Sequence, residues 1–131
     1  MERRHIRAVA AALGLLATLP GTARAQAVTP AQKAAADSAD ITVVTAGRKI
    51  FHGKGTCYAC HGPKLEGGPV APSLRGGTWR HIDGTFEGIL TRVRAGYPST
   101  AMVAYPGGIN DGDAIQIATY IYAVSQGKAK P

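Results

Sequence analysis

The stretch Cys57-Tyr58-Ala59-Cys60-His61 decides the fold, and it contains both cysteines of the chain. Two thiols three positions apart can reach the two vinyl groups on one edge of a porphyrin and form thioether bonds. With the second bond fixed at Cys60, the next residue is held beneath the macrocycle, where the imidazole of His61 can ligate iron. C-x-x-C-H is the pattern of c-type haem attachment. The spacing therefore predicts one covalently attached haem c with its iron, bound through Cys57, Cys60 and His61.

Other uses of two cysteines are less favoured by the rest of the sequence. A zinc site usually takes four ligands in two pairs, whereas His52 and His81, the other histidines outside the first 25 residues, are isolated. A thioredoxin-like redox pair belongs at the strand-to-helix corner of a βαβ unit, and no such unit is visible. A structural disulfide would leave His61 without a role. Zinc binding and thiol redox chemistry stay as minor alternatives.

The first 25 residues have the order of a cleavable signal peptide. Met1–Arg7 is basic, Ala8–Leu19 is a run of twelve apolar or small residues, and residues 23–25 form an A-x-A cleavage site. Twelve residues are too few for a membrane-spanning helix, which needs about 20. We therefore expect cleavage after Ala25, or after Ala27, to give a soluble periplasmic protein that does not span the membrane.

Composition limits the class of protein further. Of 131 residues, 45% are hydrophobic and 18% charged, so one folded domain is expected rather than a disordered or fibrous chain. The net charge of +7 includes four arginines and one glutamate of the signal segment, which leaves +4 for the remaining 106 residues. These basic residues form no run and have no aromatic platform beside them, so nucleic-acid binding is not expected.

The hydrophobic pattern predicts helices joined by long loops. Residues 26–40 are rich in alanine and polar residues and are expected to be a flexible N-terminal segment. Residues 41–52 have the apolar spacing of a short helix. Residues 53–77 are rich in glycine and proline, so they are expected to be irregular, with at most one helical turn at the cysteines.

Two further helices follow from capping residues and apolar spacing. Thr85 caps the first of them, which Gly96 ends, and a loop then leads to the second helix, which Asn110 caps. Residues 126–131 are expected to be a frayed C-terminal tail. No alternating pattern is long enough for a strand.

These features resemble the class I c-type cytochromes, small electron-transfer haem proteins of the periplasm and of mitochondria. The resemblance covers residues 41–125, the predicted cytochrome c domain. It rests on Gly47 and Phe51 before the pentapeptide, the run A-P-S-L-R-G at residues 71–76, a methionine in the second loop, and Tyr120 in the last helix. It implies an all-α cytochrome c fold of three to four short helices with long loops wrapped around the haem. It also implies that Gly47 and Phe51 pack against Tyr120.

Met102 is the expected sixth ligand of the iron. Met1 lies in the signal segment, so Met102 is the sole thioether in the remaining sequence, and it lies in the loop where the family has its axial methionine. A thioether ligand favours ferrous iron and raises the reduction potential. Methionine also fills gaps in cores without binding metal. The family usually has proline directly after this methionine, whereas this chain has Val103.

The resemblance implies roles for further residues around the haem. The Pro72 carbonyl would accept a hydrogen bond from the free ring nitrogen of His61 and orient the imidazole. Leu74 would line the haem edge. The expected donors to the propionates are Trp79, Arg80 and Tyr105. His52 and His81 are expected near the surface or the propionates, and either is the alternative sixth ligand if the methionine does not bind.

The sequence therefore predicts an electron carrier and not an enzyme. Its partners would be a redox donor and a redox acceptor with acidic docking surfaces, steered by Lys54, Lys64 and Arg75. One alternative is a haem enzyme or gas-binding sensor whose sixth iron position is open or weakly filled, which Val103 motivates. Another is a dedicated haem subunit of a periplasmic dehydrogenase, because residues 76–81 (G-G-T-W-R-H) resemble a bacterial subgroup that is often paired with such enzymes.

Overall fold

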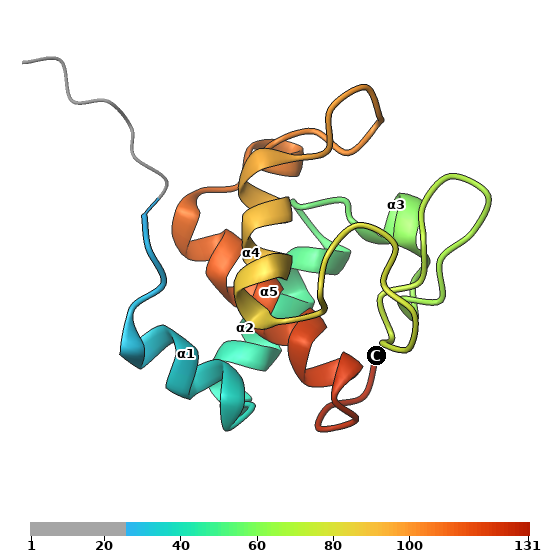
Figure 1. Ribbon diagram of the computed structural model, residues 1–131. Helices are drawn as coiled ribbons and strands as arrows, with labels where there is room; N and C mark the ends of the chain where they lie inside the picture. Colours follow the sequence, from blue (N-terminus) through green and yellow to red (C-terminus); the bar gives the residue numbers. More distant parts are fainter. Residues whose placement is uncertain (1–25) are drawn as a thin grey trace, which may run out of the picture.

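Five α-helices and a short 3₁₀ helix make up the regular structure of residues 26–131, the part of the chain that the computed structural model describes (Figure 1). The predicted signal peptide lies outside these residues. No strand occurs from residue 26 onward, so the all-α prediction is confirmed. Each helix of this part is too short or too polar to span a bilayer.

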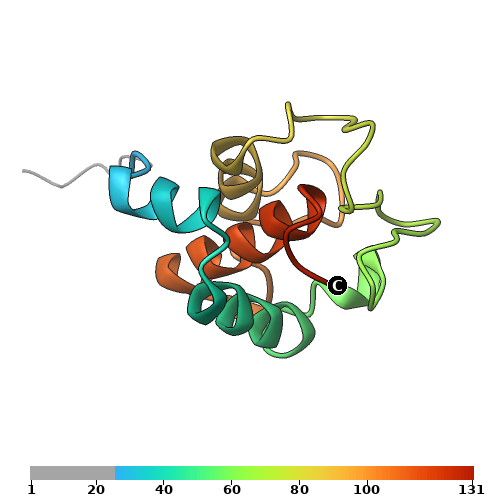
Figure 2. The same cartoon turned by 90° about the horizontal axis from the view of Figure 1, so that it is seen from below.

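Helices α2 (Ile41–His52) and α5 (Asp111–Ser125) cross and form the frame of the core. Each begins at a side chain that accepts hydrogen bonds from the first free amides of the helix: Asp40 for α2 and Asn110, in a capping box, for α5. Helix α5 is the longest element and lies at the centre of the helical part (Figure 2). Every other large element packs on it.

The crossing of α2 and α5 depends on a glycine. A Cβ at Gly47 would overlap the carbonyl oxygen of Gln116 and press on the side chain of Tyr120. Next to this contact, the buried rings of Phe51 and Tyr120 meet edge to face with centroids 5.6 Å apart. The predicted packing of Gly47 and Phe51 against Tyr120 is confirmed. The close approach compensates for the cost of about 1 kcal/mol that glycine imposes inside a helix.

Helix α4 (Phe86–Ala95) covers another side of α5. Thr85 caps it, since its side chain accepts from the amide of Gly88 at 3.0 Å. Four apolar residues of α4 are buried, at the spacing that the sequence predicted: Phe86, Ile89, Leu90 and Val93. Gly96 ends the helix with φ at +65°, and a Cβ there would collide with the backbone of residues 102–104. This glycine therefore brings the chain past the end of α4 and directly against the loop that follows.

The pentapeptide forms α3 (Tyr58–His61), a single helical turn, as the sequence predicted. A long irregular segment links α3 to α4, and η1 (Pro106–Gly108) lies just before α5. In Figure 2 the segment between α3 and α4 extends on the side of the molecule away from α1. The loops are therefore gathered on one side of the helical frame.

The segment predicted to be flexible, residues 26–40, contains a helix, α1 (Pro30–Asp37). Thr29 and Gln32 form a capping box at its start, and proline occupies its first turn. Ala36 is fully buried in the core cluster. Alanine has little apolar surface, so the spacing of the alanines in this segment did not predict a helix. The helix is instead stabilised by its packing on α5. The described chain therefore has five α-helices, whereas three to four were predicted.

The C-terminal tail also differs from the frayed segment that the sequence predicted. The amides of Lys128 and Ala129 donate to the carbonyl of Ala123 at 2.8 and 3.2 Å. The ammonium of Lys128 donates to the carbonyl of Asp37 at the end of α1, at 2.6 Å. These contacts join the C-terminal tail to the end of α1, which the local sequence alone does not indicate.

Candidate haem site

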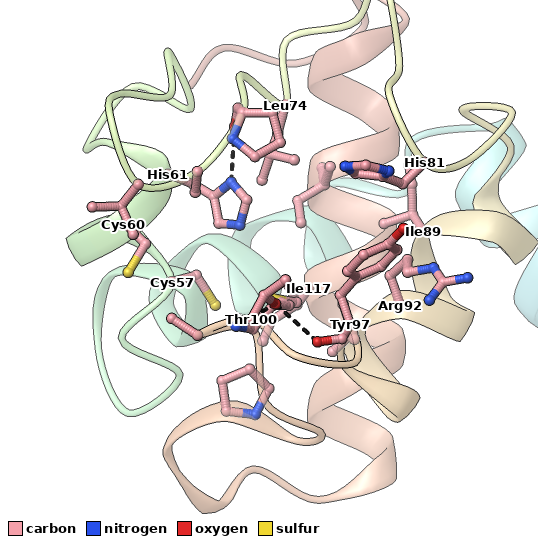
Figure 3. Close-up of a pocket in the computed structure, with 18 of the residues that line it drawn as sticks. Cys57, Cys60, His61, Leu74, His81, Ile89, Arg92, Tyr97, Thr100 and Ile117 are labelled. Atoms are coloured by element: carbon pink, nitrogen blue, oxygen red, sulfur yellow. Dashed lines mark hydrogen bonds between the residues drawn. The ribbon is translucent and has the colours of Figure 1, made fainter.

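A cavity of about 450 Å³ lies between α3, α4, α5 and the loops (Figure 3). Cys57, Cys60, His61 and Met102, the four residues predicted to hold the cofactor, all line it. Its remaining walls are largely apolar, with the following side chains: Phe51, Leu74, Ile89, Val93, Ile117 and Ile121. The fold therefore brings Met102 into the same cavity as His61, although the two residues lie 41 positions apart in the sequence.

The two cysteines are unpaired and lie on the same side of the cavity (Figure 3). Cys57 is half-buried and Cys60 is exposed. Burial raises the pKa of the Cys57 thiol to about 11, with a smaller contribution from the nearby Cys60. A neutral thiol is a poor thiol-exchange nucleophile, because that reaction needs the thiolate. A thioether, which carries no charge, is well suited to the same half-buried position.

The imidazole of His61 is oriented by one hydrogen bond. Its Nδ1 donates to the carbonyl of Pro72 at 2.9 Å, since a carbonyl can only accept, and this is the bond that the resemblance to class I cytochromes implied. The other ring nitrogen, Nε2, is then unprotonated and points into the cavity (Figure 3). Burial lowers the pKa of His61, and the bond to Pro72 opposes this shift in part. A neutral imidazole with its lone pair facing a cavity is the form that binds iron.

Met102 reaches the cavity from a loop that is closed by backbone hydrogen bonds. The Tyr97 amide donates to the carbonyl of Met102 at 2.7 Å, and the Met102 amide donates to the hydroxyl of Thr100 at 3.1 Å. Further along, the amide of Tyr105 donates to the carbonyl of Val93 on α4 at 2.9 Å. These bonds fix the loop although Val103 stands where the family usually has proline.

The predicted propionate donors divide into two groups. Trp79 and Arg80 line the cavity, whereas Tyr105 does not. The Tyr105 hydroxyl donates to Asp111 Oδ1 at 3.1 Å, and Arg94 holds the same carboxylate through two bonds of 2.7 and 2.8 Å. The prediction for Tyr105 is therefore wrong, because a carboxylate at the start of α5 already binds its hydroxyl.

The two histidines predicted as alternative ligands also differ. His52 packs among the rings of Phe51, Tyr58 and Tyr120 and lies outside the cavity lining. His81 lines the cavity, and its ring lies against that of Tyr97 with centroids 4.5 Å apart. Of these two, only His81 is placed to compete with Met102.

The sequence analysis did not identify two polar side chains of the cavity wall, Arg92 and Tyr97. The Arg92 guanidinium lies 5.1 Å from the centre of the Tyr97 ring, and its Nη1 donates to the carbonyl of Gly96 at 3.3 Å. Its Nε is buried and has no hydrogen-bond partner. The spacing of Arg92 from Ile89, three positions on the same helix, was the available signal that both face the same space.

Comparison with known proteins gives the class. The family model described as cytochrome c oxidase, cbb3-type, subunit III matches residues 42–121. Cytochrome c-554(548) of Halomonas halodenitrificans is 31% identical over 67 residues, which are 50% of this chain and 81% of that protein. The chain belongs to this family of cytochrome c domains. It is thus a class I c-type cytochrome, whose cofactor is covalently bound haem c.

Two solved structures show the same fold at low sequence identity. Cytochrome cL of the marine methylotroph Methylophaga aminisulfidivorans has a TM-score of 0.57 and 19% identity, over 72% of this chain and 67% of that one. A chain of the reducing HAO-like protein complex of Kuenenia stuttgartiensis has a TM-score of 0.52 and 21% identity, over 63% of this chain and 44% of that one. Both support the fold alone.

Proposed function

We propose that this protein is an exported, periplasmic monohaem cytochrome c that carries one electron between a redox donor and a redox acceptor. In this proposal Cys57 and Cys60 form the two thioethers, and His61 and Met102 are the axial ligands. The observation that supports it most is the convergence of these four side chains on one largely apolar cavity. When bound, haem c supplies a one-electron iron couple.

The residues of the cavity fit this group. The half-buried thiol of Cys57 is neutral, the Nε2 lone pair of His61 faces the cavity, and the thioether of Met102 lies in the same lining. The apolar walls exclude water and favour the less charged, ferrous state. Two axial ligands that stay in place in both states would keep structural change small during electron transfer. The His61–Pro72 bond and the closed Met102 loop would both serve this end.

The proposed partners carry acidic docking surfaces. The Arg75 Nε donates to the carbonyl of Lys64 at 2.6 Å, and both residues border a shallow surface pocket together with Lys130. We call Lys64, Arg75 and Lys130 the basic patch. Lys54, which the sequence also suggested, pairs with Asp113 at 2.6 Å, so part of its charge is compensated. The basic patch would speed encounter with acidic partners at low salt and lose this effect as salt rises.

Two exposed valines support docking close to the cofactor. Val70 and Val103 are 70% and 58% exposed, and both belong to the lining of the cavity. Apolar side chains at the rim of a redox site suit a small, short-lived contact, in which less than about 1,200 Å² is buried.

A direct test is to produce the chain in a host that attaches haem c. Intact mass and the spectrum of the haem in alkaline pyridine give the number of haems and the number of thioether bonds. We expect one haem per chain, a reversible one-electron potential, and no carbon monoxide binding by the reduced protein. A chain without covalent haem contradicts the proposal.

The alternative of a haem enzyme or gas-binding sensor has one observation in its favour. Arg92, Tyr97 and His81 place polar groups in the cavity lining, where an added ligand on the iron would find hydrogen-bond donors. Fast carbon monoxide binding by the reduced protein would select this alternative. Co-purification with a large periplasmic enzyme at unit ratio would select a dedicated haem subunit instead.

A further inference from the structure

The packing of the segment before α1 bears on where the exported chain begins. Gln26 is exposed, whereas Val28 packs against the core cluster and Thr29 caps α1. Cleavage after Ala27 would place a charged α-ammonium on the half-buried Val28, and burial disfavours a charge. Cleavage after Ala25 places the new terminus on an exposed residue instead. This segment therefore favours Gln26 as the first residue of the exported chain.

A glutamine at the start of a chain can close on itself. Its α-amino nitrogen attacks the side-chain carbonyl carbon Cδ, so that an N–Cδ bond forms and the Cδ–Nε2 bond breaks. The departing nitrogen takes the amine proton and leaves as ammonia, and no oxidant, reductant or second substrate takes part. The product is pyroglutamate, a neutral five-membered lactam. Gln26 is exposed and belongs to no helix, so its side chain is free to fold back onto the amine.

The contact of Gln26 with α4 favours the closed, neutral form. Arg94 Nη1 donates to the main-chain carbonyl of Gln26 at 2.6 Å. The Arg94 side chain is only 10% exposed, and both oxygens of Asp111 already accept from it. An α-ammonium on Gln26 would lie near this guanidinium and be repelled, whereas the lactam keeps the main-chain carbonyl and carries no charge. Arg94 can therefore bind the closed terminus without a cost in repulsion.

We propose that Gln26 is the first residue of the exported chain, that it is modified to pyroglutamate, and that Arg94 holds this neutral terminus against α4. Through Asp111, Arg94 is also joined to the hydroxyl of Tyr105, near the loop that carries Met102. The modified terminus is thus attached to the contacts that support this loop. The inference rests on the export that is part of the proposed function, and not on the haem ligands.

The first experiment determines the terminus by mass spectrometry of the holoprotein, produced from the full chain in a host that exports it and attaches haem c. Free amines are labelled on the denatured protein before trypsin digestion, so that closure during digestion is not counted. We expect the peptide of residues 26–48 to be lighter than its sequence by one ammonia and to carry label only at Lys33. Gln26→Asn is the matched control, because its closure would need a strained four-membered ring. This variant should keep its full mass and also take label at its terminus.

The second experiment tests the part of Arg94 by urea unfolding of wild type and Gln26→Asn at neutral pH and at a pH well above 8. The terminal amine of Gln26→Asn is charged at neutral pH and loses its charge above its ordinary pKa of about 8. Repulsion from Arg94 should lower its urea midpoint by about 0.2–0.5 M at neutral pH, and the difference should disappear at high pH. An Arg94→Gln background should abolish the difference. A background of Lys49→Gln, which removes an exposed charge of α2, should keep it.

The outcomes separate this proposal from the proposed function. A chain that begins at Val28, or at Gln26 with a free amine, would overturn the proposal while leaving the electron-carrier function intact. A chain that keeps the signal segment would overturn the proposal and the export together. A midpoint difference that is equal at both pH values, or that persists with Arg94→Gln, would overturn the part of Arg94. A closed terminus on a chain without covalent haem would support the proposal and contradict the electron-carrier function.

Discussion

The two sides of the cavity are built by different means. On one side, His61 follows directly after Cys60, and a single bond to the Pro72 carbonyl orients its ring. On the other side, Met102 arrives from a loop whose shape depends on backbone bonds to Tyr97 and α4. The first side consists of five consecutive residues and one backbone carbonyl, whereas the second depends on the packing of distant segments. Substitutions in the motif should therefore have large effects on the haem site, whereas substitutions around the loop should have graded effects.

The largest effect is expected from Cys60→Ala on the motif side. Loss of the second thioether should abolish or weaken covalent attachment, because the cofactor then depends on one sulfur and on His61. Without haem, a cavity of about 450 Å³ would stay open in a domain of 106 described residues, so little folded protein should remain. The measurement is haem stain after denaturing electrophoresis, together with far-ultraviolet circular dichroism. Full covalent attachment in this variant would contradict the assignment.

Met102→Ala should give a large effect of another kind. The haem should stay attached, but the potential should fall because the thioether that favours ferrous iron is gone. The reduced variant should also bind carbon monoxide. Potentiometry and carbon monoxide difference spectra check both statements. Wild-type behaviour in both would exclude Met102 as the ligand and leave His81 as the candidate, to be tested as His81→Gln.

A moderate effect is expected from Asp111→Asn, which disturbs the support of the Met102 loop. Asp111 joins Arg94 of α4 to the Tyr105 hydroxyl, so its charge should contribute about 1–2 kcal/mol to the free energy of unfolding. Bonding to Arg94 lowers the pKa of Asp111. The contribution is therefore present above the ordinary aspartate pKa of about 4 and is lost as pH falls through the lowered value.

Urea unfolding of the holoprotein at neutral and acid pH measures this difference. Asp37→Asn is the matched control, because its ion pair with Lys33 is exposed at α1, away from the loop, and should change stability little. Equal stability of Asp111→Asn and wild type at neutral pH would show that the loop does not depend on this carboxylate.

The smallest effect is expected from Thr100→Val. The Thr100 hydroxyl accepts from the Met102 amide and donates to the Tyr97 carbonyl at 2.8 Å, so its loss should weaken the loop by about 1 kcal/mol. The haem should stay bound while the methionine leaves iron at a lower temperature than in wild type. Thr91→Val, at an exposed position of α4, is the control. An identical temperature dependence in all three proteins would mean that this hydroxyl has no part in holding the ligand.

The difference between local motifs and contacts of distant segments also explains how much of the structure could be predicted from the sequence. The haem, the bounds of α2 and the burial pattern of α4 follow from local spacing and capping residues. The contact of Gly47 and Phe51 with Tyr120 followed from the resemblance to class I cytochromes. Helix α1 was missed because alanine gives almost no periodic signal, and its burial at Ala36 depends on α5.

The polar part of the site shows the limit of local reasoning. Tyr105 was expected to face the cofactor, but a distant carboxylate on α5 binds its hydroxyl. Arg92 was passed over because an arginine between buried apolar positions of a helix usually reaches solvent. Which polar side chain faces a cavity depends on the partners that the fold supplies, and these are not adjacent in the sequence.

The central claim is that His61 and Met102 together ligate one haem iron, and the optical spectrum of the ferric protein tests it most directly. A methionine–iron bond gives a weak far-red absorption band, which we predict for wild type and expect to be absent in Met102→Ala. A ferric wild-type protein that lacks this band, or a Met102→Ala variant that keeps it, would contradict the account.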